Sequence, residues 1–174
     1  MSAINYDLAK IRGVVFDIDG VLSPSTIPTS VEGEPLRMVN IKDGYAIQLA
    51  VKCGLHIAII TGGRSEGMRR RYESLGVTDF YSGASRKVAV LTEWMGRYGL
   101  TPDEVAYAGD DIPDYEPMMC VGLKVAPADA AVDIRQIADY VSRAEGGYGV
   151  ARDLLEQILR VRGQWLTHED AFGW

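Results

Sequence analysis

Short apolar runs alternate along the chain with longer segments in which apolar residues recur at helical spacing. Because strands separated by helices pair in parallel, this order predicts an α/β fold, a parallel sheet with helices on both faces. The expected strands are Val14–Phe16, Leu55–Ile60, Phe80–Tyr81, Val105–Ala108, Leu123–Ala126 and Tyr140–Val141. The expected helices are Ala46–Lys52, Ser65–Leu75, Lys87–Tyr98, Ile112–Cys120, Ala131–Ala138 and Val150–Arg162.

Two segments depart from this alternation. Ile27, Thr29 and Val31 alternate with other residues before a turn at Glu32–Pro35, which predicts a β-hairpin projecting from the sheet. The C-terminal segment is polar but carries three large aromatic side chains, so we expect it to dock on a neighbouring subunit. We expect one domain over residues 1–174, with a hairpin insert at about 26–41 and a C-terminal tail at about 164–174.

The composition is that of a globular protein, with 174 residues of which 47% are hydrophobic and 24% charged. The net charge of −6 argues against nucleic acid or an anionic membrane as a partner. The N-terminus does not resemble a signal peptide, and no apolar stretch approaches the roughly 20 residues that span a bilayer. We therefore expect a cytoplasmic protein with no membrane partner, and the charge still permits a small phosphorylated ligand held by a metal ion and local cations.

A pair of carboxylates follows the first expected strand. Asp17 and Asp19 are two residues apart, so both are able to face one pocket, and Gly20 permits a sharp turn after them. In such a pair, one carboxylate attacks phosphorus while the other transfers protons. Asp and Gly after a strand also form ordinary turns, so the pair gains its meaning from the rest of the chain.

Three more polar groups follow later strands or begin the helix beyond them. Ligands of an open parallel sheet bind beyond the carboxyl ends of its strands. Clustered carboxylates repel unless a cation joins them, and ligands that offer only oxygen suit Mg²⁺. A threonine hydroxyl with backbone N–H groups binds phosphate oxygens, and a lysine offsets phosphoryl charge. The groups concerned are Thr61-Gly62, Lys87, and the run Asp110, Asp111 and Asp114.

These residues resemble the four motifs of the haloacid dehalogenase-like (HAD) phosphatase superfamily. The resemblance implies a Rossmann-like fold, a Mg²⁺ cofactor and a phospho-aspartyl intermediate. The matching motifs are Asp17-Ile-Asp19-Gly20-Val21, Thr61-Gly62, Lys87 and Gly109-Asp110-Asp111-Ile-Pro-Asp114.

The resemblance also implies a role for each carboxylate. Asp17 would be the nucleophile, and Asp19 would protonate the leaving alcohol and then activate water. Asp17, Asp110 and the backbone carbonyl of Asp19 would hold the metal. Asp111 or Asp114 would support these metal ligands without contacting the metal ion itself.

The remaining candidates would bind the substrate. By the same resemblance, Thr61, Gly62 and Lys87 would hold the phosphoryl group. A sugar-acid phosphate also carries a carboxylate, and Arg64, directly after the phosphate-binding turn, suits bidentate pairing with it. The alternative for Arg64 is a solvated arginine at the start of a helix.

The motif spacing narrows the resemblance to a capless subfamily. Thr61 lies 44 residues after Asp17, and Lys87 lies 26 residues after Thr61. The expected hairpin, two helices and one strand fill these intervals, where other members of the superfamily insert a cap domain. A capless site is open to water, so such members often form oligomers in which a neighbouring subunit covers the pocket.

Within the superfamily, the chain is most similar to the 3-deoxy-D-manno-octulosonate 8-phosphate phosphatase family, whose members are homotetramers. Further resemblance lies in the segments 39–45, 60–64 and 146–153. Ser23-Pro24-Ser25 stands where the family usually has Thr-Asp-Gly, and Asp153 replaces a usual glutamate. The resemblance implies hydrolysis of the octulosonate 8-phosphate, a step of lipopolysaccharide biosynthesis.

Two alternatives remain at this point. The first alternative to an octulosonate 8-phosphate phosphatase is a phosphatase for another small phosphorylated sugar acid, such as a nine-carbon keto-deoxy acid 9-phosphate. The second is a non-catalytic assembly module. A phospho-accepting receiver domain also uses Asp, Thr and Lys on a parallel sheet, but its phospho-acceptor follows a later strand. Here the paired carboxylates Asp17 and Asp19 follow the first strand.

Overall fold

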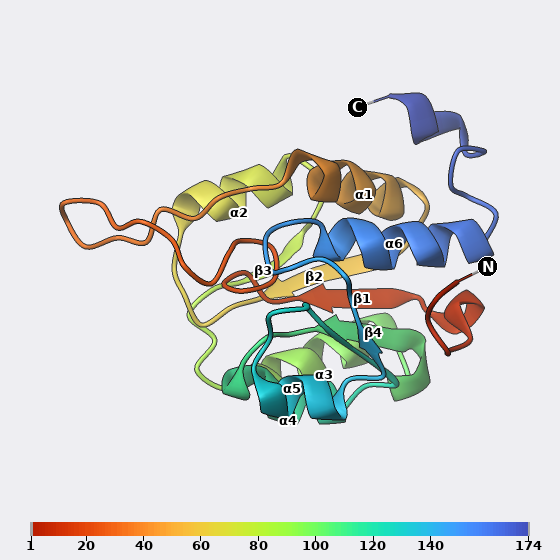
Figure 1. Ribbon diagram of the computed structural model, residues 1–174. Helices are drawn as coiled ribbons and strands as arrows, with labels where there is room; N and C mark the ends of the chain where they lie inside the picture. The colour runs from red at the N-terminus through yellow and green to blue at the C-terminus, as the bar shows by residue number, and fades with distance from the viewer. Residues whose placement is uncertain (1, 174) are drawn as a thin grey trace.

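A computed structural model describes residues 2–173 of the chain. Its centre is a six-stranded, all-parallel sheet in the order β3-β2-β1-β4-β5-β6 (Figure 1). The strands are β1 (Gly13–Phe16), β2 (His56–Ile60), β3 (Asp79–Tyr81), β4 (Val105–Ala108), β5 (Leu123–Ala126) and β6 (Tyr140–Val141). The predicted parallel sheet is confirmed, and it has the Rossmann-like α/β form.

The helices cover both faces of this sheet, with α1, α2 and α6 on one side and α3, α4 and α5 on the other (Figure 1). They are α1 (Ile41–Lys52), α2 (Glu66–Glu73), α3 (Lys87–Tyr98), α4 (Tyr115–Met119), α5 (Val132–Ile137) and α6 (Val150–Val161). Short 3₁₀ turns occur at η1 (Leu8–Lys10), η2 (Pro102–Glu104), η3 (Ile112–Asp114) and η4 (Glu169–Phe172). Within residues 2–173, no helix is long and apolar enough to span a bilayer.

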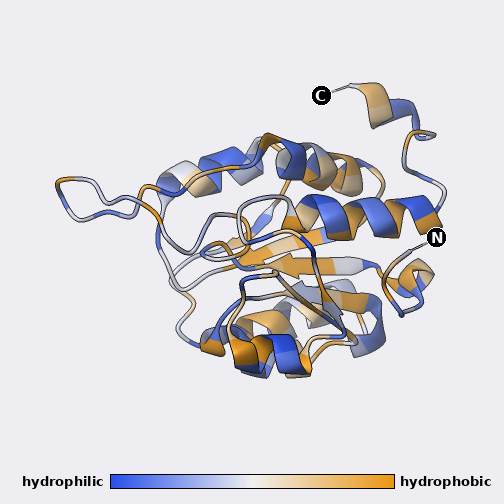
Figure 2. Cartoon of the chain, viewed as in Figure 1, coloured by the Kyte–Doolittle hydropathy of each residue, from blue (hydrophilic) through white to orange (hydrophobic). Residues whose placement is uncertain are grey.

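The sheet separates two apolar cores, and its strands are the most hydrophobic part of the fold (Figure 2). Alternate residues of β1 serve opposite faces, with Val14 and Phe16 in one core and Val15 in the other. Gly13 lies against Trp94, where a β-carbon would come 2.7 Å from the indole ring. Complete burial explains why β1 is apolar throughout instead of alternating with polar residues.

The strand order places the predicted site. From β1 the chain moves outward through β2 and β3, and it returns with β4 on the other side of β1. The carboxyl ends of β1 and β4 therefore diverge at a topological switch point, the usual ligand crevice of such sheets. Asp17 directly follows β1, and Asp110 follows β4 with only Gly109 between, so both lie at this crevice.

Helix α1 begins at Ile41, five residues before the predicted start at Ala46. The predicted hairpin insert, given as about 26–41, therefore overlaps the helix at its last residue. Asn40 is the N-cap, because its side-chain carbonyl accepts hydrogen bonds from the N–H groups of Lys42 and Asp43. Gly44 lies inside the helix, which weakens the local helical signal in the sequence.

The projecting hairpin is confirmed as a long excursion beyond the sheet, and we call residues 26–40 the arm (Figure 1). An antiparallel bridge joins Thr29 to Pro35, with hydrogen bonds from Ser30 to Glu34 and from Leu36 to Pro28. The arm has no regular strands, since this single bridge stands in place of a continuous ladder. The described part of the chain contains no inserted cap domain.

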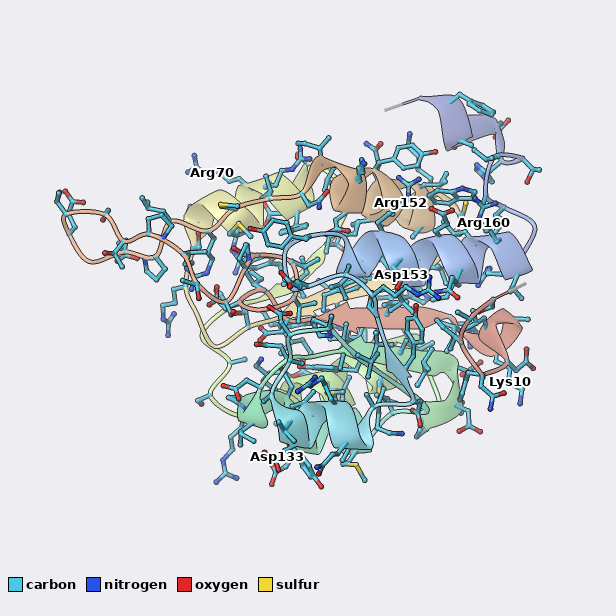
Figure 3. All side chains as sticks on the ribbon, in the orientation of Figure 1. Lys10, Arg70, Asp133, Arg152, Asp153 and Arg160 are labelled. Carbon is cyan, nitrogen blue, oxygen red and sulfur yellow. The ribbon has the colours of Figure 1, made fainter. Side chains whose placement is uncertain are left out.

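The tail after α6 folds back over its own chain. Trp165 is buried beside Tyr45, with ring centroids 5.7 Å apart, and the guanidinium of Arg152 lies 4.5 Å from the Trp165 ring. Arg152 and Arg160 both extend from the outer side of α6, beneath the tail (Figure 3). Trp165 of the tail thus docks on its own chain, while Phe172 is 81% exposed, and docking of the tail on a neighbouring subunit stays a prediction. Trp174 lies outside the described residues.

Candidate active site

A cleft of about 1400 Å³ opens at the carboxyl ends of β1, β2 and β4. Eight of the nine predicted site residues line it, and they come from loops that are far apart in the sequence. These residues are Asp17, Asp19, Thr61, Gly62, Lys87, Asp110, Asp111 and Asp114. The ninth candidate, Arg64, is not among the described residues that line this cleft.

Asp17 is buried at the floor of the cleft. Its carboxylate accepts a 2.7 Å hydrogen bond from the N–H of Ile18 and lies 2.9 Å from the ammonium of Lys87. Burial, together with the charge of Asp114, raises the pKa of Asp17 to about 7, although Lys87 and the Ile18 N–H favour the ionised form. An added cation would therefore stabilise the carboxylate that a nucleophilic role requires.

Lys87 connects two of the acidic loops. Its ammonium lies 2.9 Å from Asp17 and 2.8 Å from Asp114, and both side chains are buried with it. Burial alone lowers the pKa of Lys87, but the two carboxylates outweigh it and raise that pKa. The lysine therefore stays charged at the bottom of the cleft, where phosphoryl oxygens need a cation.

Asp114 is held by three donors. Its Oδ1 accepts hydrogen bonds from Lys87 and from the Tyr107 hydroxyl, both at 2.8 Å, and its Oδ2 accepts one from the N–H of Asp110 at 3.2 Å. Tyr107 lies on β4, with its ring in the core under the cleft. This arrangement makes Asp114 a support for Lys87, and a contribution of Asp111 or Asp114 behind the metal ligands stays a prediction.

Asp17, Asp110 and Asp114 offer carboxylate oxygens within 4.8 Å of one another. Burial, followed by the charges of Asp114 and Asp17, raises the pKa of Asp110 to about 8. Three carboxylates around one lysine leave negative charge unbalanced, and the donor set is oxygen only. These features fit a hard divalent cation such as Mg²⁺. Asp114 accepts three hydrogen bonds, whereas the Asp110 carboxylate accepts none among the described residues, so Asp110 is the better placed ligand beside Asp17.

Two glycine contacts keep these loops together. A β-carbon on Gly20, which has φ +82°, would lie 1.9 Å from Oδ2 of Asp110. A β-carbon on Gly146 would lie 2.0 Å from the carbonyl oxygen of Gly20. Only glycine allows this approach of the loop before α6 to the loop after β1.

The phosphate-binding turn follows β2. The N–H of Thr61 donates to Tyr81 at 2.9 Å, and its hydroxyl oxygen accepts a 3.2 Å bond from the N–H of Gly63. Gly62 is exposed, and nothing lies within 4 Å of the position of a β-carbon there. The turn therefore presents the Thr61 hydroxyl and open backbone to the cleft, as phosphate binding requires.

Comparison with known proteins gives a consistent result, although no protein-family model matches the chain. The chain is 38% identical over 155 residues to the 3-deoxy-D-manno-octulosonate 8-phosphate phosphatase KdsC of Escherichia coli K12, covering 89% of this chain and 82% of that protein. The same identity relates it to the crystal structure of the Yersinia pestis phosphatase of that name, with a TM-score of 0.86 over 90% of this chain and 85% of that one. This chain belongs to the 3-deoxy-D-manno-octulosonate 8-phosphate phosphatase family.

A further solved structure of this family contains bound ligands. The Moraxella catarrhalis phosphatase, crystallised with a magnesium ion, a phosphate ion and KDO, is 29% identical to this chain. Its TM-score is 0.84, and the match covers 88% of each chain. The family assignment confirms the resemblance to HAD phosphatases, the phosphatase activity class and the magnesium cofactor.

The structure adds arginines that motif reading did not find. Arg37, from the arm, donates two 2.8 Å hydrogen bonds to the carboxylate of Asp19. Arg86 lines the cleft directly before Lys87. Arg64 instead lies against Gly83, where its guanidinium carbon is 2.8 Å from the position of a β-carbon. Its pairing with a substrate carboxylate stays a prediction.

The missed arginines left little signal in the sequence. Arg37 follows Pro35 and Leu36 in an irregular segment, so neither strand nor helix periodicity indicates where its side chain lies. Its partner Asp19 is 18 residues earlier. The available signal for Arg37 was the segment 39–45, which resembles the octulosonate phosphatase family and begins two residues after Arg37.

Proposed function

We propose that this chain, as a single HAD-like domain over residues 1–174, hydrolyses 3-deoxy-D-manno-octulosonate 8-phosphate to the free sugar acid and phosphate with the help of Mg²⁺. The observation that carries the proposal is the buried Asp17 carboxylate 2.9 Å from Lys87 at the floor of the cleft. Membership of the octulosonate phosphatase family supports the substrate.

In the first step, an oxygen of Asp17 attacks phosphorus and the bond from phosphorus to the sugar oxygen breaks. Asp19 donates a proton to the departing oxygen, so the sugar leaves as an alcohol and Asp17 becomes a phospho-aspartate. Thr61, Gly62 and Lys87 hold the phosphoryl oxygens throughout. A nucleophile held rigidly by Lys87 and the Ile18 N–H needs little rearrangement to attack.

In the second step, water attacks the same phosphorus. Asp19, now ionised, takes a proton from this water, and the bond between phosphorus and Asp17 breaks. Phosphate is released, Asp17 is again a carboxylate and Asp19 is again protonated. Asp17, Asp110 and the backbone carbonyl of Asp19 would hold the Mg²⁺ ion. When bound, the ion supplies positive charge for the carboxylates and the phosphoryl oxygens.

We also propose a cytoplasmic homotetramer in which a neighbouring subunit completes the cleft. Several apolar side chains on and beside the arm are exposed in the single chain, which supports an interface there. Val31 is 99% exposed at the arm tip. The others are Leu36, Met38, Val39 and Ile41.

The first experiment measures phosphate release with and without Mg²⁺. The substrates are the octulosonate 8-phosphate, a nine-carbon keto-deoxy acid 9-phosphate and a neutral sugar phosphate. We expect the octulosonate ester to have the highest kcat/KM and chelation to abolish turnover. Asp17→Asn should lower kcat by about 10⁴-fold or more, as loss of a nucleophile does in other hydrolases.

The matched control is Asp103→Asn, which changes an exposed carboxylate at η2 and should leave turnover intact. Preference for the nine-carbon ester would keep the mechanism and replace the substrate. Unchanged turnover in Asp17→Asn would contradict the nucleophile assignment. No phosphate release from any ester would favour a non-catalytic module.

A further inference from the structure

The arm meets the catalytic loop through one arginine. Nε and Nη2 of Arg37 each donate a 2.8 Å hydrogen bond to Asp19, one to each carboxylate oxygen. The Arg37 side chain is only 6% exposed, whereas that of Asp19 is 44% exposed and faces the cleft. This is a bidentate, charge-assisted pair at the edge of the active site.

The pair also fixes the position of the Asp19 carboxyl group. To act on the leaving group, Asp19 must turn one oxygen toward the leaving oxygen of the ester, and both of its oxygens now accept N–H groups from Arg37. That turn breaks the bidentate geometry of the pair. A buried guanidinium that loses its acceptor needs another one, because an unpaired buried charge is costly.

Among the described residues, the guanidinium forms one hydrogen bond besides those to Asp19, and the charges of Glu34 and Asp17 also act on it. The backbone carbonyl of Arg64 is 3.5 Å from Nη1, at the limit of a hydrogen bond. Nη2 lies 2.4 Å from the position that a β-carbon on Gly63 would occupy, so the guanidinium packs on the phosphate-binding turn. Asp19 and Gly63 both line the cleft, which puts Arg37 at its rim, within reach of an anionic group on a bound ligand.

We propose that Arg37 is shared between Asp19 and the carboxylate of the substrate. In the unliganded enzyme Arg37 pairs with Asp19, and a sugar-acid phosphate draws the guanidinium to its own carboxylate. The exchange releases Asp19 from the guanidinium, so that its carboxyl group is free to turn to the leaving oxygen of the ester. Arg37 thus selects phosphate esters that also carry a carboxylate, an inference that rests on the proposed function.

The test compares Arg37→Met and Arg37→Lys with the wild type on three phosphates. The octulosonate 8-phosphate has a carboxylate and an alcohol leaving group, and ribose 5-phosphate has the alcohol alone. p-Nitrophenyl phosphate has neither, since its leaving group departs without a proton. Arg12→Met is the control, because Arg12 forms a partly exposed pair with Glu104 just before β1, at the opposite end of the strand from the cleft.

For Arg37→Met, we expect kcat/KM to fall about 100-fold on the octulosonate ester, the effect of losing one buried charged contact. The same variant should match or exceed the wild type on ribose 5-phosphate, because Asp19 is no longer paired, and should be unchanged on p-nitrophenyl phosphate. Arg37→Lys keeps the charge without the bidentate geometry, so its loss on the octulosonate ester should be smaller.

Two outcomes would overturn the proposal. Equal losses on the octulosonate ester and on ribose 5-phosphate would mean that Arg37 only orients Asp19. Equal losses on all three phosphates would mean a structural role for Arg37.

A second measurement separates this proposal from the proposed substrate. Glycerate 3-phosphate has a carboxylate where glycerol 3-phosphate has a hydroxymethyl group, and the two are otherwise the same. Each is tested as an inhibitor of p-nitrophenyl phosphate hydrolysis. The wild type should bind the carboxylated compound more tightly, and Arg37→Met should lose that preference even if the octulosonate ester is not a substrate. A preference retained in Arg37→Met would refute the exchange.

Discussion

At the scale of single residues, the site depends on the balance between one lysine and its carboxylates. Lys87 contacts Asp17 and Asp114, and Asp110 lies beside them with a raised pKa. Removing one member of such a buried network leaves charge unpaired, so each member is sensitive to substitution. Tyr107 is the neutral member, so its substitution tests the geometry of the network without changing the charge of the network.

Tyr107→Phe removes the 2.8 Å hydrogen bond to Asp114 and keeps the ring in the core. We expect the free energy of unfolding to fall by about 1–2 kcal/mol, because a buried carboxylate loses a donor. Lys87 then moves more freely, and kcat should fall by up to about tenfold. Urea denaturation and steady-state kinetics measure the two effects.

Tyr6→Phe is the matched control, since the Tyr6 hydroxyl donates to a backbone carbonyl in an exposed region, at Asp103. It should change neither kcat nor, by more than about 0.5 kcal/mol, the free energy of unfolding. Equal stability losses in the two variants, with kcat preserved, would show that Tyr107 does not support Lys87.

The sequence revealed those site residues whose position follows from strand ends. Asp17, Thr61 and Asp110 come directly or nearly directly after apolar strands, and parallel strands bring their carboxyl ends together. Tyr107 escaped attention because a tyrosine within an apolar strand indicates only a core position. Arg37 escaped because no periodic element carries it, so only the folded arm places it at Asp19.

At the scale of elements, a buried carboxylate joins the two helices that cover one face of the sheet. Asp43 in the first turn of α1 accepts a 2.7 Å hydrogen bond from the N–H of Arg152 in the first turn of α6. Its other oxygen is buried without a hydrogen-bond partner among the described residues. Burial raises the pKa of Asp43 to about 6, although Arg152 opposes the shift.

Asp43→Asn tests this contact through the pH dependence of stability. Because the pKa is higher in the folded than in the unfolded chain, the folded state binds more protons between about pH 4 and 6. The wild type therefore loses stability as the pH rises through this window, and the asparagine variant lacks that loss. Its stability advantage should grow from near zero at pH 4 to about 2 kcal/mol at pH 8.

Urea denaturation of both proteins across this pH range measures the difference. The other titrating groups are common to both proteins, so their contributions cancel. An advantage that stays constant with pH, or a loss of stability at pH 8, would show that Asp43 is ionised in the fold without a penalty.

Element boundaries followed from the sequence where side chains report them, and less well elsewhere. The limits of α3 are those predicted, since Gly99 in a left-handed conformation ends the helix. The start of α1 was placed too late, because an N-cap at Asn40 outweighs the weak helical signal of Gly44. The arm was located but not its detailed form, since one bridge leaves no strand pattern to detect.

At the scale of the whole molecule, the exposed apolar residues of the arm favour association of several chains. The single chain leaves Val31 at the tip of the arm and Ile41, directly after the arm, largely exposed. Apolar side chains gathered on a projecting segment indicate a surface that another chain covers. The proposed homotetramer therefore has a defined structural test.

The double variant Val31→Asp and Ile41→Asp should convert tetramers to smaller species. Four chains of 19.1 kDa are expected for the wild type in sedimentation velocity, and a single chain for the variant. Aspartate is favourable in the first turn of a helix, so substitution at Ile41, the first residue of α1, preserves the fold.

Val161→Lys is the control, because Val161 is exposed at the end of α6, where a cation suits the helix dipole. It should leave the assembly unchanged. A double variant that remains tetrameric would place the interface elsewhere, and a wild type that sediments as a single chain would contradict the tetramer itself.

Because a single bridge holds the arm together, the arm tolerates sequence divergence more readily than the catalytic loops do. Residues between Thr29 and Pro35 have little share in the core, so replacing them costs little folding energy. Gly20 and Asp110, in contrast, restrict each other by direct contact and have almost no freedom to vary. Descendants of this chain are therefore free to acquire new subunit partners through the arm while they inherit the same chemistry at the strand ends.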